Sequence, residues 1–286
     1  LTVAILFGIA LALVNPPVIM ISLQYSNMFL LMLAVSIVLM LLLANKRPRY
    51  EIFLFFTIAG CLTSFFDLLT TPSITLGIPL LLYVAFRIKH KGQKNLLKDT
   101  LLIMVLWGVG YFVAWFAKWL IGSIILHRNI FADATQKILF WSQDSSTIAS
   151  VPENTASLSV FTVLTDWLKR LVIYWPVLVV TIIGAVVAVS VRLFSKRNSF
   201  KFSLLTLLAV AIVTIIPIAW VILARQHSFN HQWFSYRHLI ILLLGTTLII
   251  WYLGALKTKL QYKTILANVQ AKTKWLAATL LGKNRS

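Results

Sequence analysis

The chain alternates between long apolar runs and short polar stretches. A helix needs about 20 apolar residues to cross a hydrocarbon core of about 30 Å, and several runs approach or exceed that length. The pattern therefore predicts an all-α protein, a polytopic membrane bundle of about eight transmembrane helices. The predicted spans are residues 1–14, 26–44, 51–70, 74–88, 99–126, 171–194, 202–224 and 239–256.

Composition agrees with this class, and the distribution of charge orients the bundle. Hydrophobic residues make up 60% of the chain and charged residues only 12%. Most of the 26 Lys and Arg residues gather in residues 46–49, 87–98, 192–201 and 257–285. Pairs of predicted spans separate these places, so all four lie on one side, which the positive-inside rule makes cytoplasmic. We therefore expect a multi-pass protein of the bacterial cytoplasmic membrane, with the first and last residues of this chain both inside.

The two ends of the chain carry separate predictions. Residues 257–286 interleave lysines with apolar residues, which predicts a basic helix on the inner leaflet, where each lysine gains about 1 kcal/mol from anionic lipid. No base-reading module accompanies it, so membrane lipids and not nucleic acids are the expected partners. Residues 1–14 form a short first run without a basic leader, so we expect further residues upstream. The single Cys61 is expected to pack as a small hydrophobe.

Residues 127–170 form the longest predicted loop on the outer side, and it is too long for a simple connection. A second helix is expected to begin near residues 155–157 and to carry Trp167 toward the next span. The first part of the loop predicts an interfacial helix over residues 131–141. Its apolar stripe consists of Phe131, Ala134, Ile138 and Trp141. Such helices either form a lid or wall over a membrane cavity or simply brace the bundle.

The aromatic residues near the ends of the spans predict interfacial belts. Trp and Tyr gather where the membrane meets water, because one end of each ring is apolar and the other is polar. The expected outer belt holds Trp115, Trp119, Trp141, Trp167 and Trp175, and the inner one holds Trp251 and Tyr252.

Residues 225–238, called the polar segment below, join two predicted spans with more polar chemistry than a connection needs. His227 and His231 are four residues apart, a spacing that metals use, but no carboxylate or cysteine accompanies them, so no metal site is predicted. Arginine matches phosphate oxygens, and aromatic rings stack on sugars or prenyl chains. The alternative is an aromatic belt with snorkelling arginines. The predicted phosphate- and sugar-binding residues are Arg225, His227, Asn230, His231, Trp233, Tyr236 and Arg237.

Asp67 is an acidic residue near the outer end of its predicted span. An ionisable residue within a span is costly and by default indicates function. Asp67 is thus one candidate for a catalytic carboxylate. The alternatives are that it caps the turn before Pro72 or that it pairs with Arg237.

Three stretches resemble a known superfamily. They are residues 63–79 (TSFFDLLTTPSITLGIP), 227–237 (HSFNHQWFSYR) and 22–26 (SLQYS). With the span pattern, they make the chain similar to a group of bacterial polytopic membrane proteins with the layout of the GT-C superfamily of membrane glycosyltransferases. The resemblance implies transfer of a sugar from a polyprenyl-phosphate donor on the outer face, with interfacial helices and no further cofactor.

The chain departs from the superfamily at one important point. The usual catalytic acid lies in the first outer loop, and here that loop, residues 15–25, has no Asp or Glu. We expect that acid to lie upstream of this chain, so the sequence leaves open whether the chain is an enzyme. Two alternatives are a transporter or flippase of a lipid-linked or anionic substrate and a non-catalytic membrane scaffold. A transporter would carry ionisable residues on interrupted helices, and Pro79, Pro176 and Pro217 are positions for such a break.

Overall fold

The computed structural model describes residues 22–67, 70–91, 94–142, 159–173, 203–249 and 251–252, together with residues 270 and 273. The regular elements in these ranges are helical, so the all-α class is confirmed. The α-helices are α3 (Leu23–Ala44), α4 (Arg49–Phe66), α5 (Ile74–Phe86), α6 (Leu96–Leu126), α7 (Ile130–Ser142), α8 (Val160–Ile173), α10 (Leu204–Thr214), α11 (Ile216–Leu223), α12 (Arg225–Asn230) and α13 (Gln232–Ser235). A π-helix, η1 (Arg87–Lys91), a 3-10 helix, η3 (Tyr236–His238), and a helix over residues 239–249 complete the set.

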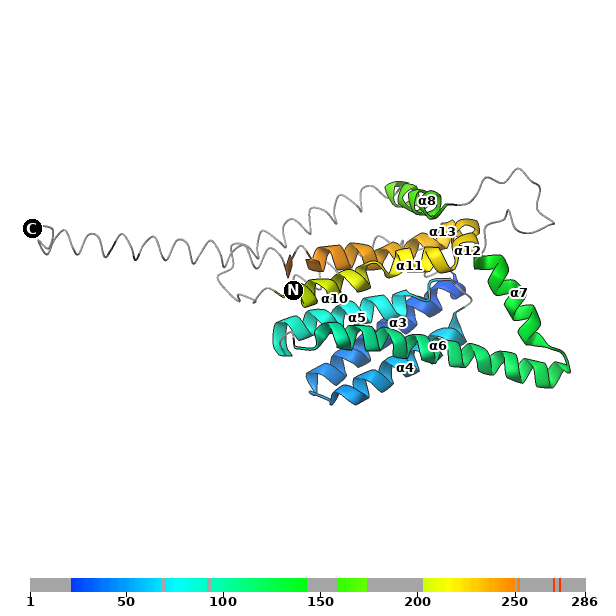
Figure 1. Ribbon diagram of the computed structural model, residues 1–286, viewed down its shortest axis with the longest axis horizontal. Helices are drawn as coiled ribbons and strands as arrows, with labels where there is room; N and C mark the ends of the chain where they lie inside the picture. Colours follow the sequence, from blue (N-terminus) through cyan, green and yellow to red (C-terminus); the bar gives the residue numbers. More distant parts are fainter. Residues whose placement is uncertain are drawn as a thin grey trace, which may run out of the picture.

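The longer helices lie side by side as a bundle (Figure 1). Its core joins α3, α5 and α10, where Met32, Ile78 and Val213 are buried together. The α3–α4 turn and η1 lie at one end, called the inner end after the orientation that the charges predict. The α6–α7 turn lies at the other end, called the outer end, where α7 runs back toward α12 and α8 packs over α11 to α13 (Figure 1).

Three described helices are long and apolar enough to cross a membrane, and they are Ser26–Ala44, Arg49–Phe66 and Leu96–Leu126. They correspond to the predicted spans 26–44, 51–70 and 99–126. The pair of α10 and α11 adds a fourth candidate if the two helices, bent by 43°, form one span. The described residues thus hold fewer spans than the eight predicted.

The shortfall has three causes. Residues 1–14, most of 171–194 and the end of 239–256 lie outside the described residues. The predicted span 74–88 contains an α-helix of only 13 residues, which passes into the π-helix η1. The predicted span 202–224 is broken before Pro217, which stands in the first turn of α11. Proline fits a first helical turn because its missing N–H would have no partner there, so it favours a new helix over a continued one.

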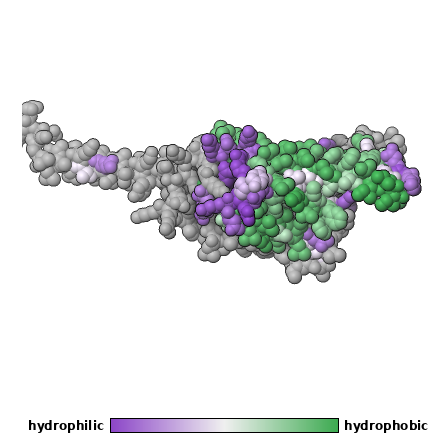
Figure 2. All heavy atoms as spheres, turned by 90° about the horizontal axis from the view of Figure 1, so that it is seen from below, coloured by the Kyte–Doolittle hydropathy of each residue, from purple (hydrophilic) through white to green (hydrophobic). Residues whose placement is uncertain are grey.

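The surface of the bundle is apolar over much of its length. Figure 2 shows hydrophobic side chains covering one face and hydrophilic side chains gathered at one end. Large exposed apolar residues include Ile37 on α3, Leu54 on α4 and Val105 on α6, which are 60%, 59% and 60% exposed. Soluble monomers rarely expose apolar patches of this extent, so the surface is compatible with a protein inserted in a membrane.

Helices α4 and α6 approach each other closely at two glycines. A Cβ atom at Gly60 would overlap the carbonyl oxygen of Trp107, and one at Gly110 would overlap the carbonyl oxygen of Thr57. Small residues allow such backbone approach between membrane helices. Cys61 packs into the same contact, as expected, and its thiol donates to the carbonyl oxygen of Gly110 at 3.2 Å.

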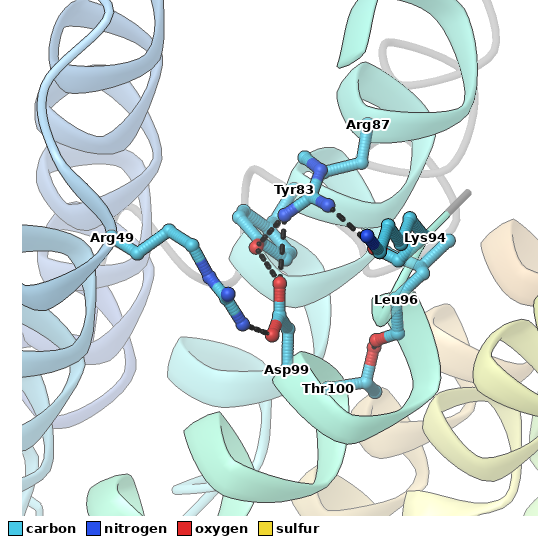
Figure 3. Close-up of polar contacts among 7 residues, drawn as sticks. All are labelled: Arg49, Tyr83, Arg87, Lys94, Leu96, Asp99 and Thr100. Atoms are coloured by element: carbon cyan, nitrogen blue, oxygen red, sulfur yellow. Dashed lines mark hydrogen bonds and ion pairs between the residues drawn. The ribbon is translucent and has the colours of Figure 1, made fainter. Parts of the chain in front are cut away.

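A buried ionic network at the inner end joins α4, α5, η1 and α6 (Figure 3). Asp99 is fully buried, and its Oδ1 accepts a hydrogen bond from Arg49. Its Oδ2 accepts from the Arg87 guanidinium at 2.7 Å and from the Tyr83 hydroxyl at 3.0 Å. Arg87 also donates to the carbonyl oxygen of Lys94 at 3.0 Å. Both carboxylate oxygens are therefore satisfied, which burial of an ionised acid requires.

The glycine contact predicts a specific loss of stability. Gly110→Ala should lower the free energy of unfolding by about 1–3 kcal/mol, because the added methyl group meets backbone that cannot move aside. Gly108→Ala is the matched control, since the same helix leaves open space there. Thermal unfolding in detergent would measure both variants. Equal unfolding midpoints for the two variants would contradict the contact.

The ionic network yields a second prediction. Asp99→Asn should cost about 3–5 kcal/mol, because it leaves the nearly buried Arg87 without its counterion. Glu51→Gln is the control, since it removes only a surface pair with Arg47 at 3.8 Å, which is worth up to about 1 kcal/mol. Chemical denaturation of the two variants beside the parent protein measures the difference, and similar losses would argue against a structural role for Asp99.

Candidate functional site

The polar segment folds at the outer end as three short helical pieces, α12, α13 and η3. His227 lies on α12, and His231 lies in the turn after it. Their ring centroids are 4.7 Å apart, so the two imidazoles lie close together although the helix ends between them.

The last turn of α7 packs on these two histidines. The Trp141 ring meets His227 edge-on at 5.0 Å between centroids and lies 5.6 Å from His231. Phe234 also stacks on His231, at 5.2 Å between centroids. Burial lowers the pKa of His231 below its ordinary value. The contact fixes α7 as a wall beside the polar segment.

His238 occupies the centre of the outer end. Its ring stacks between Trp167, at 5.7 Å and an interplanar angle of 9°, and Trp220, at 5.3 Å and 24°. Its Nδ1 is hydrogen-bonded to the Ser73 hydroxyl. The pKa of His238 is lowered to about 3, chiefly by burial and also by the charge of His227, while a hydrogen bond with the Thr70 backbone opposes the shift. The imidazole is thus neutral at physiological pH.

The structure differs from what the sequence predicts at Trp167, Tyr252 and His238. Trp167 does not lie in an interfacial belt, because it is fully buried and donates to the carbonyl oxygen of Ser228 at 3.3 Å. Tyr252 is fully buried too, and its hydroxyl accepts from the Ser203 backbone N–H at 2.9 Å. His238 was not among the predicted site residues, since a histidine at the edge of an apolar run gives no local sign of its partners. Trp175 lies outside the described residues.

The seven predicted binding residues divide by accessibility. His227, Tyr236 and Arg237 are buried, at 5%, 3% and 2% exposure. The Arg237 guanidinium donates to the carbonyl oxygen of Trp233 at 3.1 Å and lies 4.9 Å from the Tyr236 ring centroid. The residues that keep exposed surface are Arg225, Asn230, His231 and Trp233.

Asp67 caps the turn that follows α4, as one interpretation of the sequence expected. Its Oδ1 accepts from the backbone N–H of Thr70 at 2.8 Å and from the Thr70 hydroxyl at 2.6 Å. The side chain is only 4% exposed. Next to this turn, the Lys118 ammonium donates to the carbonyl oxygen of Ser64. The structural role of Asp67 is therefore visible, and a catalytic role stays a prediction.

A cavity of about 480 Å³ lies between α6, α7 and α11 at the outer end. Its size falls within the range of about 300–1,000 Å³ that is typical of ligand sites. Aromatic side chains form much of the lining, and they are Tyr111, Trp115, Trp119, Trp141 and Trp220. Helix α7 thus forms a wall of the cavity, whereas α8 contributes no lining residue and packs against α11, α12 and α13.

The aromatic lining continues a ladder along one face of α6. The rings of Trp107 and Tyr111 stack at 5.2 Å, and those of Tyr111 and Trp115 stack at 5.8 Å. Trp119 meets Trp115 at 5.4 Å. A spacing of four residues places successive side chains on one helical face, which is why the rings align. Trp115 and Trp119 therefore line the cavity, where sequence analysis expected a belt.

The cavity adjoins the polar segment through two shared tryptophans. Trp220 lines the cavity and stacks on His238. Trp141 lines it and contacts His227 and His231. The lining ends at Ala224, directly before Arg225. An apolar chain and an anionic group of one ligand can therefore be accommodated side by side.

No protein-family model matches the chain, and neither a curated protein nor a solved structure shows significant similarity to it. The resemblance to the GT-C layout therefore stays a prediction. The candidate site is defined by the contacts and the cavity described above.

The pKa of His238 predicts a dependence of stability on pH. The pKa of His238 in the folded protein, about 3, lies below the ordinary value of 6.5. The neutral imidazole therefore contributes to the free energy of unfolding above pH 6.5, and this contribution is lost as the pH falls toward 3. The unfolding midpoint should fall between pH 6.5 and about pH 4.5, and less steeply in His238→Gln. Tryptophan fluorescence would measure the unfolding midpoint at each pH, and His90→Gln is the control because His90 is exposed. Identical slopes in the parent and His238→Gln would contradict the burial of a neutral imidazole.

Proposed function

We propose that this chain is an integral membrane protein that binds a polyprenyl-phosphate sugar at its outer end and belongs to a GT-C-like sugar-transfer system. The observation that carries the proposal is the contact between an aromatic cavity and a polar segment through Trp141 and Trp220. A lipid-linked sugar has the two matching parts, a long apolar chain and an anionic headgroup.

The cavity suits the apolar part of such a ligand. Aromatic rings offer large apolar faces, and an isoprenoid chain offers flat unsaturated units that pack on them. The rings of α6 are pre-ordered by stacking on one another, so little conformational entropy is lost when a chain binds.

The polar segment suits the headgroup. Arg225 follows the cavity wall directly, and His231 and Asn230 keep exposed surface beside it. An arginine fork binds phosphate oxygens with two parallel hydrogen bonds. Trp233, which is half exposed, adds a ring face of the kind that sugars stack on.

A transporter or flippase of a lipid-linked substrate is the second candidate function. The observation that favours it is the break of 43° between α10 and α11. Trp220 and Leu223 of α11 line the cavity, so the interrupted helix forms part of the site. Interrupted helices at a binding site are typical of secondary transporters.

Photo-crosslinking tests the proposed binding. Decaprenyl phosphate with a diazirine in its chain should label peptides of α6, α7 and α11 when the protein is reconstituted in nanodiscs. Trp115→Leu should reduce labelling several-fold, because it removes a ring from the cavity wall. Phe112→Leu is the matched control, since Phe112 lies on the same helix and is 60% exposed.

The outcome also separates the two functions. Labelling spread evenly over the exposed apolar surface, with Trp115→Leu and Phe112→Leu alike, would contradict a lipid site in the cavity. Release of a labelled sugar from the bound donor supports transfer. Movement of the intact lipid between leaflets of a liposome, without release of sugar, supports the flippase.

A further inference from the structure

Helix α7 brings two charged side chains to the cavity. Asp133 and Lys137 are the charged residues among those that line it. They are one helical turn apart, so both lie on the face that α7 turns toward α6. Neither residue belongs to the apolar stripe of Phe131, Ala134, Ile138 and Trp141 on this helix.

Each of the two charged side chains has a partner on or next to α7. The Lys137 ammonium lies 5.4 Å from the Phe140 ring centroid and 5.9 Å from that of Trp141. The Asp133 carboxylate pairs with Arg128 at 2.5 Å, and its side chain is 45% exposed. Both groups are therefore accessible and anchored, unlike Asp67, which is 4% exposed and bonded within its own turn.

We propose that α7 supplies the ionic centre of the site, in which Lys137 binds the phosphate of the lipid donor and Asp133 is the base for the acceptor hydroxyl. The inference rests on the proposed function and assigns it two residues outside the polar segment. A carboxylate and a cation at one cavity are what transfer from a lipid phosphate requires, since a proton must be removed and a leaving phosphate stabilised.

The transfer step balances with these two residues. The acceptor hydroxyl loses its proton to the Asp133 carboxylate, and its oxygen forms a bond to the anomeric carbon of the sugar. The bond between that carbon and the phosphate oxygen breaks, and its electron pair stays on the phosphate. Lys137 stabilises the charge that develops on the polyprenyl phosphate. Asp133 then releases the proton to water.

Two variants test the two roles separately in the full chain reconstituted in nanodiscs. Lys137→Gln should weaken binding of decaprenyl phosphate about tenfold and leave binding of decaprenol, the same chain without the phosphate, within about twofold. Asp133→Asn should leave decaprenyl phosphate binding within about twofold and slow release of the hexose from a decaprenyl-phosphate hexose, with water as acceptor, about 100-fold or more.

The chain offers a matched control pair on the other outer helix. Asp166 and Lys169 of α8 pair at 2.9 Å on the surface and do not line the cavity. Asp166→Asn and Lys169→Gln should leave every readout unchanged, so a general effect of outer charge on lipid binding would show itself there.

Each outcome decides one statement. Unaltered decaprenyl phosphate binding by Lys137→Gln overturns the role of Lys137. Unaltered hexose release by Asp133→Asn, or no release by the parent protein that binds the donor, overturns the role of Asp133. If the parent binds decaprenyl phosphate no better than decaprenol, the proposed function itself is wrong, because the site then does not recognise the phosphate.

Discussion

The close contact between α4 and α6 is the constraint on which both ends of the molecule depend. Gly60 and Gly110 bring the two backbones together and fix the axial position of α6. From that position, α6 places Asp99 between arginines at the inner end and Trp115 at the cavity of the outer end. A side chain at either glycine would separate the helices and disturb the two sites together.

The two ends satisfy buried polar groups in different ways. At the inner end, two arginines and a tyrosine donate hydrogen bonds to both oxygens of Asp99. At the outer end, His238 stays neutral between two tryptophans, and Asp67 is held by its own turn. The network at the inner end holds α4, η1 and α6 together through Asp99. The outer end combines a rigid polar core with an open cavity, which is the combination that a binding site needs.

Sequence reasoning succeeded where the signal is local. The spans 26–44, 51–70 and 99–126 and the helix of α7 follow from apolar composition and helical spacing within single segments. Sequence reasoning failed where the burial of a side chain depends on residues far away in the chain. The sequence pattern predicted that Trp167 lies in an interfacial belt. Its ring instead stacks on His238 and its N–H donates to the carbonyl oxygen of Ser228, and both residues are far along the chain. Within the predicted span 202–224, the bend of 43° falls at Pro217 in the first turn of α11, a position that the sequence had marked for a break.

The sequence by itself determined an all-α chain with membrane-length apolar helices and a polar segment rich in His and Arg, because periodicity and composition are properties of neighbouring residues. Only the tertiary structure decided that Arg237 is buried while Arg225 keeps exposed surface, that the α6 tryptophans line a cavity, and that Asp133 and Lys137 share it. The physical reason is that burial depends on which other segments cover a side chain, and the segments that form this site are more than 80 residues apart from α6 to α11.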